Sequence, residues 1–384
     1  PPPPAGLARD LQDTLRLAGD FQDMLDVIRR WTMDRQFQIG VRILRGISDA
    51  DGAGGPLADV ADVAIQTLQA RVEQAFVAAH GRLPGDGIAT IALGKLGSRE
   101  MTVISDLDLI FIYDVPTGQE SDEAWNTQLS DGAKKLAPIH YYARLAQRLI
   151  NAITAPTGEG RLFEVDMRLR PSGNQGPIAS SPEGFRRYQE ESAWTWEHMA
   201  LTRARVIAAQ PALAARVEAV LRDILTRPRD PVRLVKDVAE MRARIAQQYP
   251  GSQFWDLKYR PGGMIDVEFI AQYLQLRHAA ADASVLHPNT TEALRRLTMA
   301  GFLPAAVAEE LIAASRLWHN LLGMLRLTVG TALDEASLAA GVSRALVSAG
   351  GAADFDDLKA RVDATAARVR GHFTALVGKP AAAD

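Results

Sequence analysis

The chain has 384 residues, of which 47% are hydrophobic and 23% charged, so it is expected to be a globular protein with two or three folding units. A net charge of −3 argues against binding nucleic acid through a broadly basic surface. The absence of cysteine excludes disulfides and thiolate zinc sites, and no apolar run reaches the ~18 residues of a membrane span. These features favour a cytoplasmic protein.

The first part of the chain has the spacing of amphipathic helices. Apolar residues recur at helical intervals from Leu7 to Phe76. The glycine-rich stretch 48–57 predicts a break between helices, and the turn at 80–87 predicts the end of this part. We therefore expect an N-terminal helical segment over residues 1–85.

The period changes between Ile88 and about Ala208. Short β-branched or aromatic runs at 88–93 and 107–113, and an alternating run at 161–170, predict strands, whereas 139–153 predicts an amphipathic helix. This pattern indicates a mixed α/β domain over residues 86–209. Helical periodicity returns after Pro211 and predicts a helical bundle over residues 210–384, so the fold class is α+β, mostly helical, with a small mixed sheet.

Two carboxylates lie one residue apart at the head of the second predicted strand. If the strand includes both, Asp106 and Asp108 point to the same face, ~6.5–7 Å apart along the backbone. Two such charges repel each other unless a cation lies between them, and Mg²⁺ takes oxygen ligands. The pattern therefore predicts a metal site at this end of the strand.

A third carboxylate and two arginines follow in "EVDMRLRPSG". On a strand, Asp166, Arg168 and Arg170 would share one face with Glu164. Three acids that hold two metal ions, and arginines that neutralise phosphates, suit the transfer of a phosphoryl or nucleotidyl group. The glycines of "GKLG", residues 94–97, would let backbone N–H groups approach a triphosphate.

Each of these motifs alone has an ordinary structural explanation. Asp-x-Asp occurs often at solvated strand ends, "GKLG" lacks the spacing of a P-loop, and "RLRP" also suits the end of a surface strand. Their occurrence together and in order favours catalysis. His198 is expected to be a structural hydrogen-bonding residue, and Trp194 and Trp196 to be core or interface anchors, with base stacking as the alternative.

Gly94, eleven residues, and then Asp106 and Asp108 resemble the signature of glutamine synthetase adenylyltransferases, within the DNA polymerase beta-like nucleotidyltransferase superfamily. The resemblance extends over "YYARLAQRLI", "EVDMRLRPSG", "YQEESAWTWEHMALTRARVI" and "DLKYRPGGMIDVEFIAQYL". The family has two such halves: one attaches AMP to a tyrosine of glutamine synthetase, and the other removes it by phosphorolysis. "RPSG" and "AWTWEH" resemble the C-terminal, AMP-attaching half. The start without methionine, the single copy and the alanine-rich end suit a C-terminal fragment of a longer protein.

The resemblance also implies roles for individual residues. Asp106 and Asp108 would hold both Mg²⁺ ions, and Asp166 would complete the site and accept the proton of the attacking hydroxyl. The other implied residues concern the triphosphate of ATP: Gly94 and Ser105 would frame it, Lys95 is a weaker candidate, and Arg168 and Arg170 would either contact phosphates or brace the acids. Ser98 departs from the second glycine that is common in the family. The implied partners are glutamine synthetase, the PII signalling protein and glutamine as an effector, without nucleic acid or membrane.

Three other functions remain open. AMP removal is the nearest alternative, because it uses the same acids. A template-independent RNA nucleotidyltransferase would share the acids but should carry a basic or aromatic-basic face. A nucleotide-sensing module with an inactive site would have lost an acid, and all three are present.

The stretch 256–269 is a further distinctive feature. Its glycine pair at 262–263 predicts a turn into a helix, with Asp266 near the helix start. We expect Asp266 to form a buried ion pair with Lys258 or Arg260. The alternative is that this stretch lines the rim of the active site.

Overall fold

The computed structural model describes residues 3–116, 123–330, 333 and 335–378. The alanine-rich end, 381–383, lies outside these residues. In the described part the protein is an α+β fold, mostly helical, with a small mixed sheet, as predicted. No helix in that part has both the length and the apolar character needed to cross a membrane.

The N-terminal part consists of three helices. These are α1 (Pro4–Leu15), α2 (Phe21–Leu44) and α3 (Ala50–His80). The prediction of a break over residues 48–57 was wrong in position: α3 already begins at Ala50 and contains Pro56. The carboxylate of Asp49 accepts a hydrogen bond from the Gly52 amide at 2.7 Å. This cap satisfies an N–H group of the first turn and allows the glycine-rich segment to be helical.

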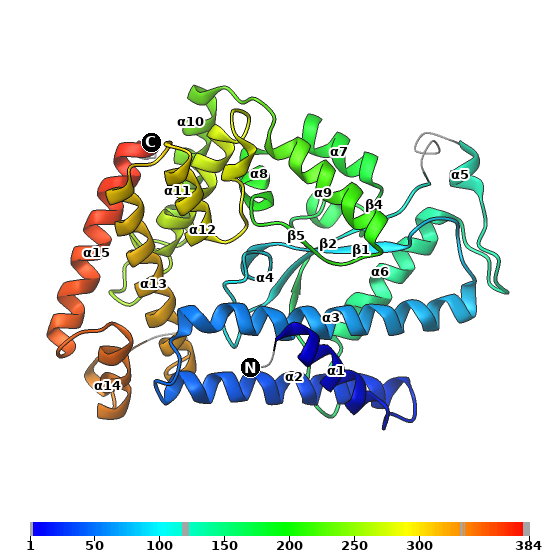
Figure 1. The fold of residues 1–384 in the computed structure, drawn as a ribbon, viewed down its shortest axis with the longest axis horizontal. Helices are drawn as coiled ribbons and strands as arrows, with labels where there is room; N and C mark the ends of the chain where they lie inside the picture. The colour runs from blue at the N-terminus through cyan, green and yellow to red at the C-terminus, as the bar shows by residue number, and fades with distance from the viewer. Residues whose placement is uncertain (1–2, 117–122, 331–332, 334, 379–384) are drawn as a thin grey trace.

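The sheet lies at the centre of the molecule (Figure 1). Its order is β3-β2-β1-β5, and β4 also pairs with β2. The strands are β1 (Ile88–Ala92), β2 (Leu107–Tyr113), β3 (Val165–Asp166), β4 (Ala179–Ser180) and β5 (Arg205–Ala208). β1 is antiparallel to β2 and β5, whereas β3 and β4 run parallel to β2. β1 is buried over its whole length, as its unbroken run of small and apolar residues requires.

Helices cover both faces of the sheet. The long α3 runs beneath it, and α7 and α9 lie above it (Figure 1). The helices inserted between strands are α4 (Gly94–Ser98), α5 (Glu123–Thr127), α6 (Pro138–Thr154), α7 (Pro182–Glu191) and α8 (Thr195–Leu201), with a 3₁₀ turn, η1 (Gly173–Gln175). The strands predicted at 88–93 and 107–113 and the helix predicted at 139–153 are confirmed to within a residue.

The chain after β5 is helical, as predicted. Its elements are α9 (Pro211–Leu225), α10 (Pro231–Gln248), α11 (Met264–His278), η2 (Ala283–Val285), α12 (Thr290–Met299), α13 (Ala305–Thr328), η3 (Glu335–Ser337), α14 (Ala340–Ala349) and α15 (Phe355–Leu376). Among the described residues after 208 there is no strand. The domain boundaries at 85/86 and 209/210 stay predictions.

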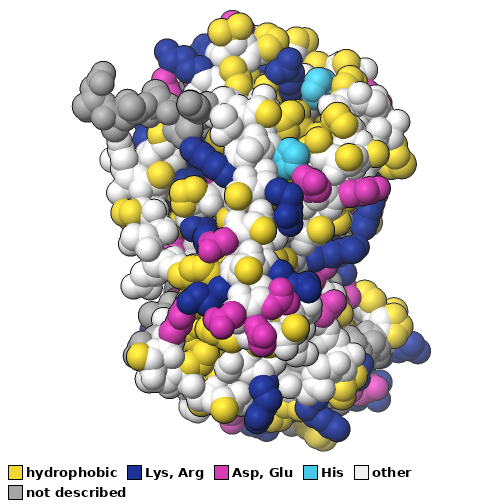
Figure 2. Space-filling model, turned by 90° about the vertical axis from the view of Figure 1, so that its left-hand side faces the viewer, with side chains coloured by type: hydrophobic (Ala, Val, Ile, Leu, Met, Phe, Trp, Pro, Cys, Tyr) yellow, Lys and Arg dark blue, Asp and Glu magenta, His cyan; other side chains and the backbone are white. Residues whose placement is uncertain are grey.

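Acidic and basic side chains are mixed across the face formed by the C-terminal helices (Figure 2). Neither sign dominates it, so this face has no broad basic surface of the kind that non-specific nucleic-acid binding uses.

Candidate active site

Asp106 and Asp108 flank the first residue of β2. Leu107 between them is fully buried in the core, while Asp106 is exposed and Asp108 is half-buried. Among the described residues, neither aspartate side chain accepts a hydrogen bond or pairs with a cation. Uncompensated carboxylates at the head of a buried strand are unfavourable in the absence of a cation.

The third acid, Asp166, lies beside Asp108. β2 and β3 pair in parallel with Asp108 opposite Asp166. Burial, and next the negative charges of Asp106 and Asp166, raises the pKa of Asp108 from 3.8 to about 6. The pairing of the strands therefore brings the predicted carboxylates within electrostatic reach of one another.

Arg168 engages the carboxylate of Asp166. The Arg168 side chain donates from Nε to Oδ2 at 2.8 Å, and its backbone amide donates to Oδ1 at 2.8 Å. Burial alone would raise the pKa of Asp166, but the hydrogen bonds from Arg168 outweigh burial and lower it. Of the two roles predicted for Arg168, the structure shows bracing of an acid.

The prediction of a strand through residues 161–170 was wrong beyond Asp166. β3 has two residues, because the side chain of Asp166 caps the Arg168 amide and turns the chain. Glu164 and Arg170 therefore do not share a strand face with Asp166. Glu164 pairs with Arg161, and Arg170 donates to the Met167 carbonyl at 3.1 Å within its own loop.

Gly94 lies against the side chain of Asp108. Its φ is +51°, and a Cβ at this position would lie 1.9 Å from Oδ2 of Asp108. Only glycine therefore allows the α4 turn to approach the acid this closely. Ser105 is buried, and its Oγ accepts a hydrogen bond from the Thr102 amide at 2.9 Å, which closes the turn before Asp106.

Asp106 is accessible from solvent. A hollow of about 530 Å³ is lined by Ser105, Asp106 and Glu164, together with Gln36 of α2. A polar group on another molecule can therefore approach Asp106 through this opening.

The three acids do not form a preformed metal cage. Among the described residues no group of three His, Cys, Asp or Glu side chains is arranged to hold a metal ion. The donors themselves suit Mg²⁺, since all are carboxylate oxygens and two are unpartnered. Asp166 would have to turn away from Arg168 to join Asp106 and Asp108.

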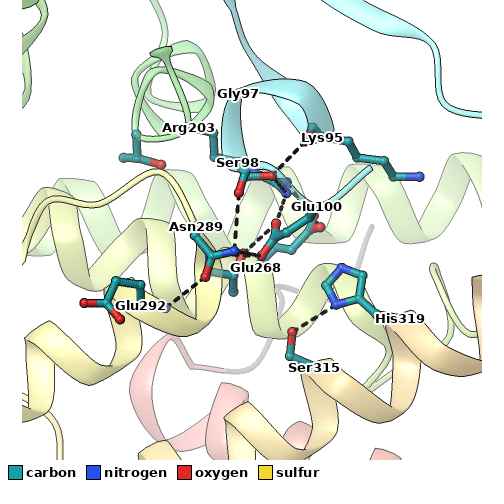
Figure 3. A network of polar contacts seen from close by, with 12 residues as sticks. Lys95, Gly97, Ser98, Glu100, Arg203, Glu268, Asn289, Glu292, Ser315 and His319 are labelled. Atoms are coloured by element: carbon teal, nitrogen blue, oxygen red, sulfur yellow. Dashed lines mark hydrogen bonds and ion pairs between the residues drawn. The ribbon is translucent and has the colours of Figure 1, made fainter. Parts of the chain in front are cut away.

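A buried ion network that the sequence did not suggest supports α4 (Figure 3). Arg203, 8% exposed, binds Glu100 and Ser98 and pairs with Glu268 of α11 at 3.2 Å. Burial opposes the charge of Arg203, but the two glutamates outweigh it and raise its pKa. The hydroxyl of Ser98 accepts one of these hydrogen bonds at 2.8 Å. α4 is thus fixed to the C-terminal helices.

The ion pair predicted for Asp266 was assigned to the wrong partner. Asp266 lies in the first turn of α11, after the predicted glycine turn, and is fully buried. It pairs with Arg242 of α10 and accepts from the Gly262 amide at 2.6 Å. Arg260 instead pairs with Asp363 at 2.7 Å. The pairing with Arg242 joins residues 24 positions apart, which local sequence does not reveal.

The predictions for His198 and Trp194 have different outcomes. His198 is the expected structural residue, with its Nε2 2.9 Å from the Gln189 carbonyl oxygen. Trp194 is 66% exposed, so it is not part of the core.

Comparison with known proteins gives two matched segments. Residues 1–220 match the glutamate-ammonia ligase adenylyltransferase family, and residues 236–377 match the GlnD PII-uridylyltransferase family. Three curated relatives share the description bifunctional glutamine synthetase adenylyltransferase/adenylyl-removing enzyme. Those from Rhodopseudomonas palustris (strain TIE-1), Bradyrhizobium sp. (strain BTAi1) and Xanthobacter autotrophicus (strain Py2) are 47%, 45% and 42% identical over 98%, 97% and 98% of the chain. The chain spans 37% of the length of each of these relatives.

Proposed function

Because the chain belongs to the glutamate-ammonia ligase adenylyltransferase family, we propose that it transfers AMP from ATP to a tyrosine hydroxyl of glutamine synthetase and releases pyrophosphate. One observation carries the proposal. Two unpartnered carboxylates, Asp106 and Asp108, lie at the head of β2, and the strand pairing puts Asp166 opposite Asp108. This arrangement suits a reaction in which the carboxylates bind cations and the cations bind negatively charged phosphates.

We propose that Asp106 and Asp108 hold two Mg²⁺ ions and that Asp166 completes the set. Bound there, the ions would polarise the phosphate and make the attacking hydroxyl acidic, because a tyrosine hydroxyl has an ordinary pKa of ~10. The residues themselves supply position and charge. Gly94 leaves room for the Asp108 carboxylate, and Ser105 holds the turn from which Asp106 extends.

In the proposed reaction the tyrosine oxygen forms a bond to the α-phosphorus of ATP. The bond between that phosphorus and the α–β bridging oxygen breaks, and pyrophosphate leaves with the electron pair. The hydroxyl proton passes to Asp166. Arg168 lowers the proton affinity of this carboxylate, so its guanidinium must move aside before Asp166 accepts the proton.

The regulatory partners and the location are proposals of the same kind. The match of residues 236–377 to a PII-uridylyltransferase family supports a link to the PII signalling protein, with glutamine as the effector of the longer protein. We propose a cytoplasmic location, where glutamine synthetase and ATP would both be available.

The test is to incubate the chain with purified glutamine synthetase and α-³²P-labelled ATP, with and without phosphate. We expect Mg²⁺-dependent labelling of the synthetase and release of pyrophosphate. AMP removal is the rival outcome. If phosphate makes the chain strip AMP from adenylylated synthetase as ADP, and no label is ever attached, the proposed direction of transfer is wrong.

A further inference from the structure

A polar hollow of about 560 Å³ lies where four parts of the chain meet. Its walls come from the first turns of α3, the segment 99–102 after α4, the start of α12 and the middle of α13. The acids Asp106, Asp108 and Asp166 do not line it. The hollow is therefore separate from the candidate active site, and its volume is that of a pocket for a small molecule.

His319 of α13 is a buried polar residue in the wall of this hollow. It is 7% exposed, and its Nδ1 lies 3.3 Å from Oδ1 of Asp51 and 3.4 Å from Oγ of Ser315. In Figure 3 one ring nitrogen faces Ser315 and the other points away from it. Among the described residues, Nε2 has no hydrogen-bond partner. A buried polar atom without a partner is unfavourable, so Nε2 is available to a ligand.

Arg316 lies beside His319 in the same hollow. The two residues are three positions apart on α13, which puts their side chains on one face of the helix. Both approach the carboxylate of Asp51: Nε of Arg316 is 4.0 Å from Oδ2, whereas His319 faces Oδ1. Arg316 is exposed and donates no hydrogen bond to the described residues, so its guanidinium keeps its donors free.

Positive charge exceeds negative charge around Asp51. Burial alone would raise the pKa of Asp51, but the hydrogen bond with His319 and the positive charges of Arg316 and Arg295 outweigh burial and lower it. Burial likewise opposes the charge of His319, but Asp51 and Glu100 outweigh it and raise the His319 pKa. A protonated imidazole donates from both nitrogens, so Nε2 presents an N–H group to the hollow.

The other charged residues of the hollow have closer partners. These pairs are Glu100 with Arg203, Arg99 with Asp59 at 2.7 Å, and Glu292 with Arg296 at 3.4 Å. The groups with unused hydrogen-bonding capacity are therefore the cations that share Asp51.

We propose that His319 and Arg316, together with the exposed Arg295, bind the carboxylate or phosphate group of a small organic anion in this hollow. The Nε2–H group of His319 and the guanidinium of Arg316 donate to the oxygens of that group, and such charge-assisted hydrogen bonds are strong. The hollow is larger than one ionic group, so it also has room for the rest of the molecule. The site goes beyond the proposed function and does not depend on it.

The experiment is an NMR titration of the chain, labelled with ¹⁵N in its histidine rings, in the presence of EDTA. The titrants are succinate, inorganic phosphate, and sodium chloride at matched ionic strength. The His319 signals, identified by their loss in His319→Gln, should shift and saturate with succinate or phosphate, and the active titrant identifies the recognised group. His372 is a matched control, because it pairs with the carboxylate of Glu310 but does not line the hollow. Its signals should not shift.

Replacing Arg316 tests the second half of the site. Arg316→Gln should weaken binding ~10-fold, because one charge-assisted hydrogen bond is lost, and Arg316→Lys should recover part of the loss. Arg361→Gln on α15 should bind like the wild type, since Arg361 is similarly exposed and is paired within its own helix. Both arginines are at the surface, so neither replacement is expected to unfold the chain.

Three results would overturn the inference. They are His319 signals that respond to neither succinate nor phosphate, an equal shift with sodium chloride, and unchanged affinity in Arg316→Gln. The titration contains neither ATP nor glutamine synthetase, so its outcome leaves the proposed function untouched. Labelling of glutamine synthetase, measured separately, tests that function.

Discussion

Replacing Asp108 by asparagine should stabilise the metal-free protein while it disables transfer. Asparagine keeps the shape of the side chain and removes one of the carboxylates that repel each other at the head of β2. The Asp108 side chain accepts no hydrogen bond from the described residues, so no native contact is lost. A structural aspartate would give the opposite result, because its replacement leaves a donor unpaired.

The magnitude follows from the pKa of Asp108, which is about 6 in the folded chain and 3.8 for an ordinary aspartate. A carboxyl whose folded pKa is raised binds its proton more tightly in the folded state, so ionisation destabilises the fold as pH rises from ~4 to ~6. Two pKa units correspond to ~3 kcal/mol, and partial solvent screening reduces this to ~1–3 kcal/mol. The variant should be more stable by this amount at pH 8, and the difference should vanish below pH ~4.

The assay is urea unfolding of both proteins in EDTA at pH 8 and pH 4, followed by melting with Mg²⁺ and measurement of AMP transfer. With Mg²⁺ the wild type should gain more stability than the variant, because ligand binding to the folded state shifts the unfolding equilibrium. Transfer by the variant should fall at least ~10²-fold. Lower stability of the variant in EDTA at pH 8, or near-normal transfer, would refute the metal-site reasoning.

Two further substitutions test the surroundings of the acids. Gly94→Ala should cost ~1–2 kcal/mol for the left-handed backbone and should lower transfer by displacing Asp108, as unfolding and labelling assays would show. Arg203→Met should cost ~3–5 kcal/mol in urea unfolding because it leaves Glu100 and a second glutamate buried without a cation, and an unchanged midpoint would contradict this.

Strand β2 could be predicted from sequence because its signal is local. Six apolar or aromatic residues, interrupted only by Asp108, follow the acid at 106, and the strand has the predicted bounds, Leu107–Tyr113. β3 could not be predicted in length, because its end is set by a hydrogen bond from a backbone amide to the side chain of Asp166. An alternating pattern does not show at which aspartate the side chain will accept a hydrogen bond from a nearby backbone amide and so end the strand.

The parts of the site that depend on distant contacts were also missed. Arg326 is a single charged residue in the apolar run "LLGMLRLT", which is a signal for a functional or buried cation. The sequence does not show that its partner is Thr102, 224 residues away. Asp266 illustrates the same limit, since the two basic residues predicted as its partners, Lys258 and Arg260, are near it in sequence, whereas Arg242, which pairs with it, lies on α10.

The geometry of the acids depends on both matched segments of the chain. The α4 turn that contacts Asp108 belongs to the first segment, yet Arg203 ties it to Glu268, and Asn289 donates to the Ser98 carbonyl at 3.3 Å. A buried arginine between two glutamates adds little net stability, because desolvation of the three charges opposes their attraction. The desolvation cost of Arg203, Glu100 and Glu268 is offset only when the three side chains are in contact. Any shift of α11 relative to α4 would therefore leave a buried charge unpaired. The network therefore favours one placement of the C-terminal helices, and in that placement Arg326 of α13 donates to Thr102 in the turn that precedes Asp106.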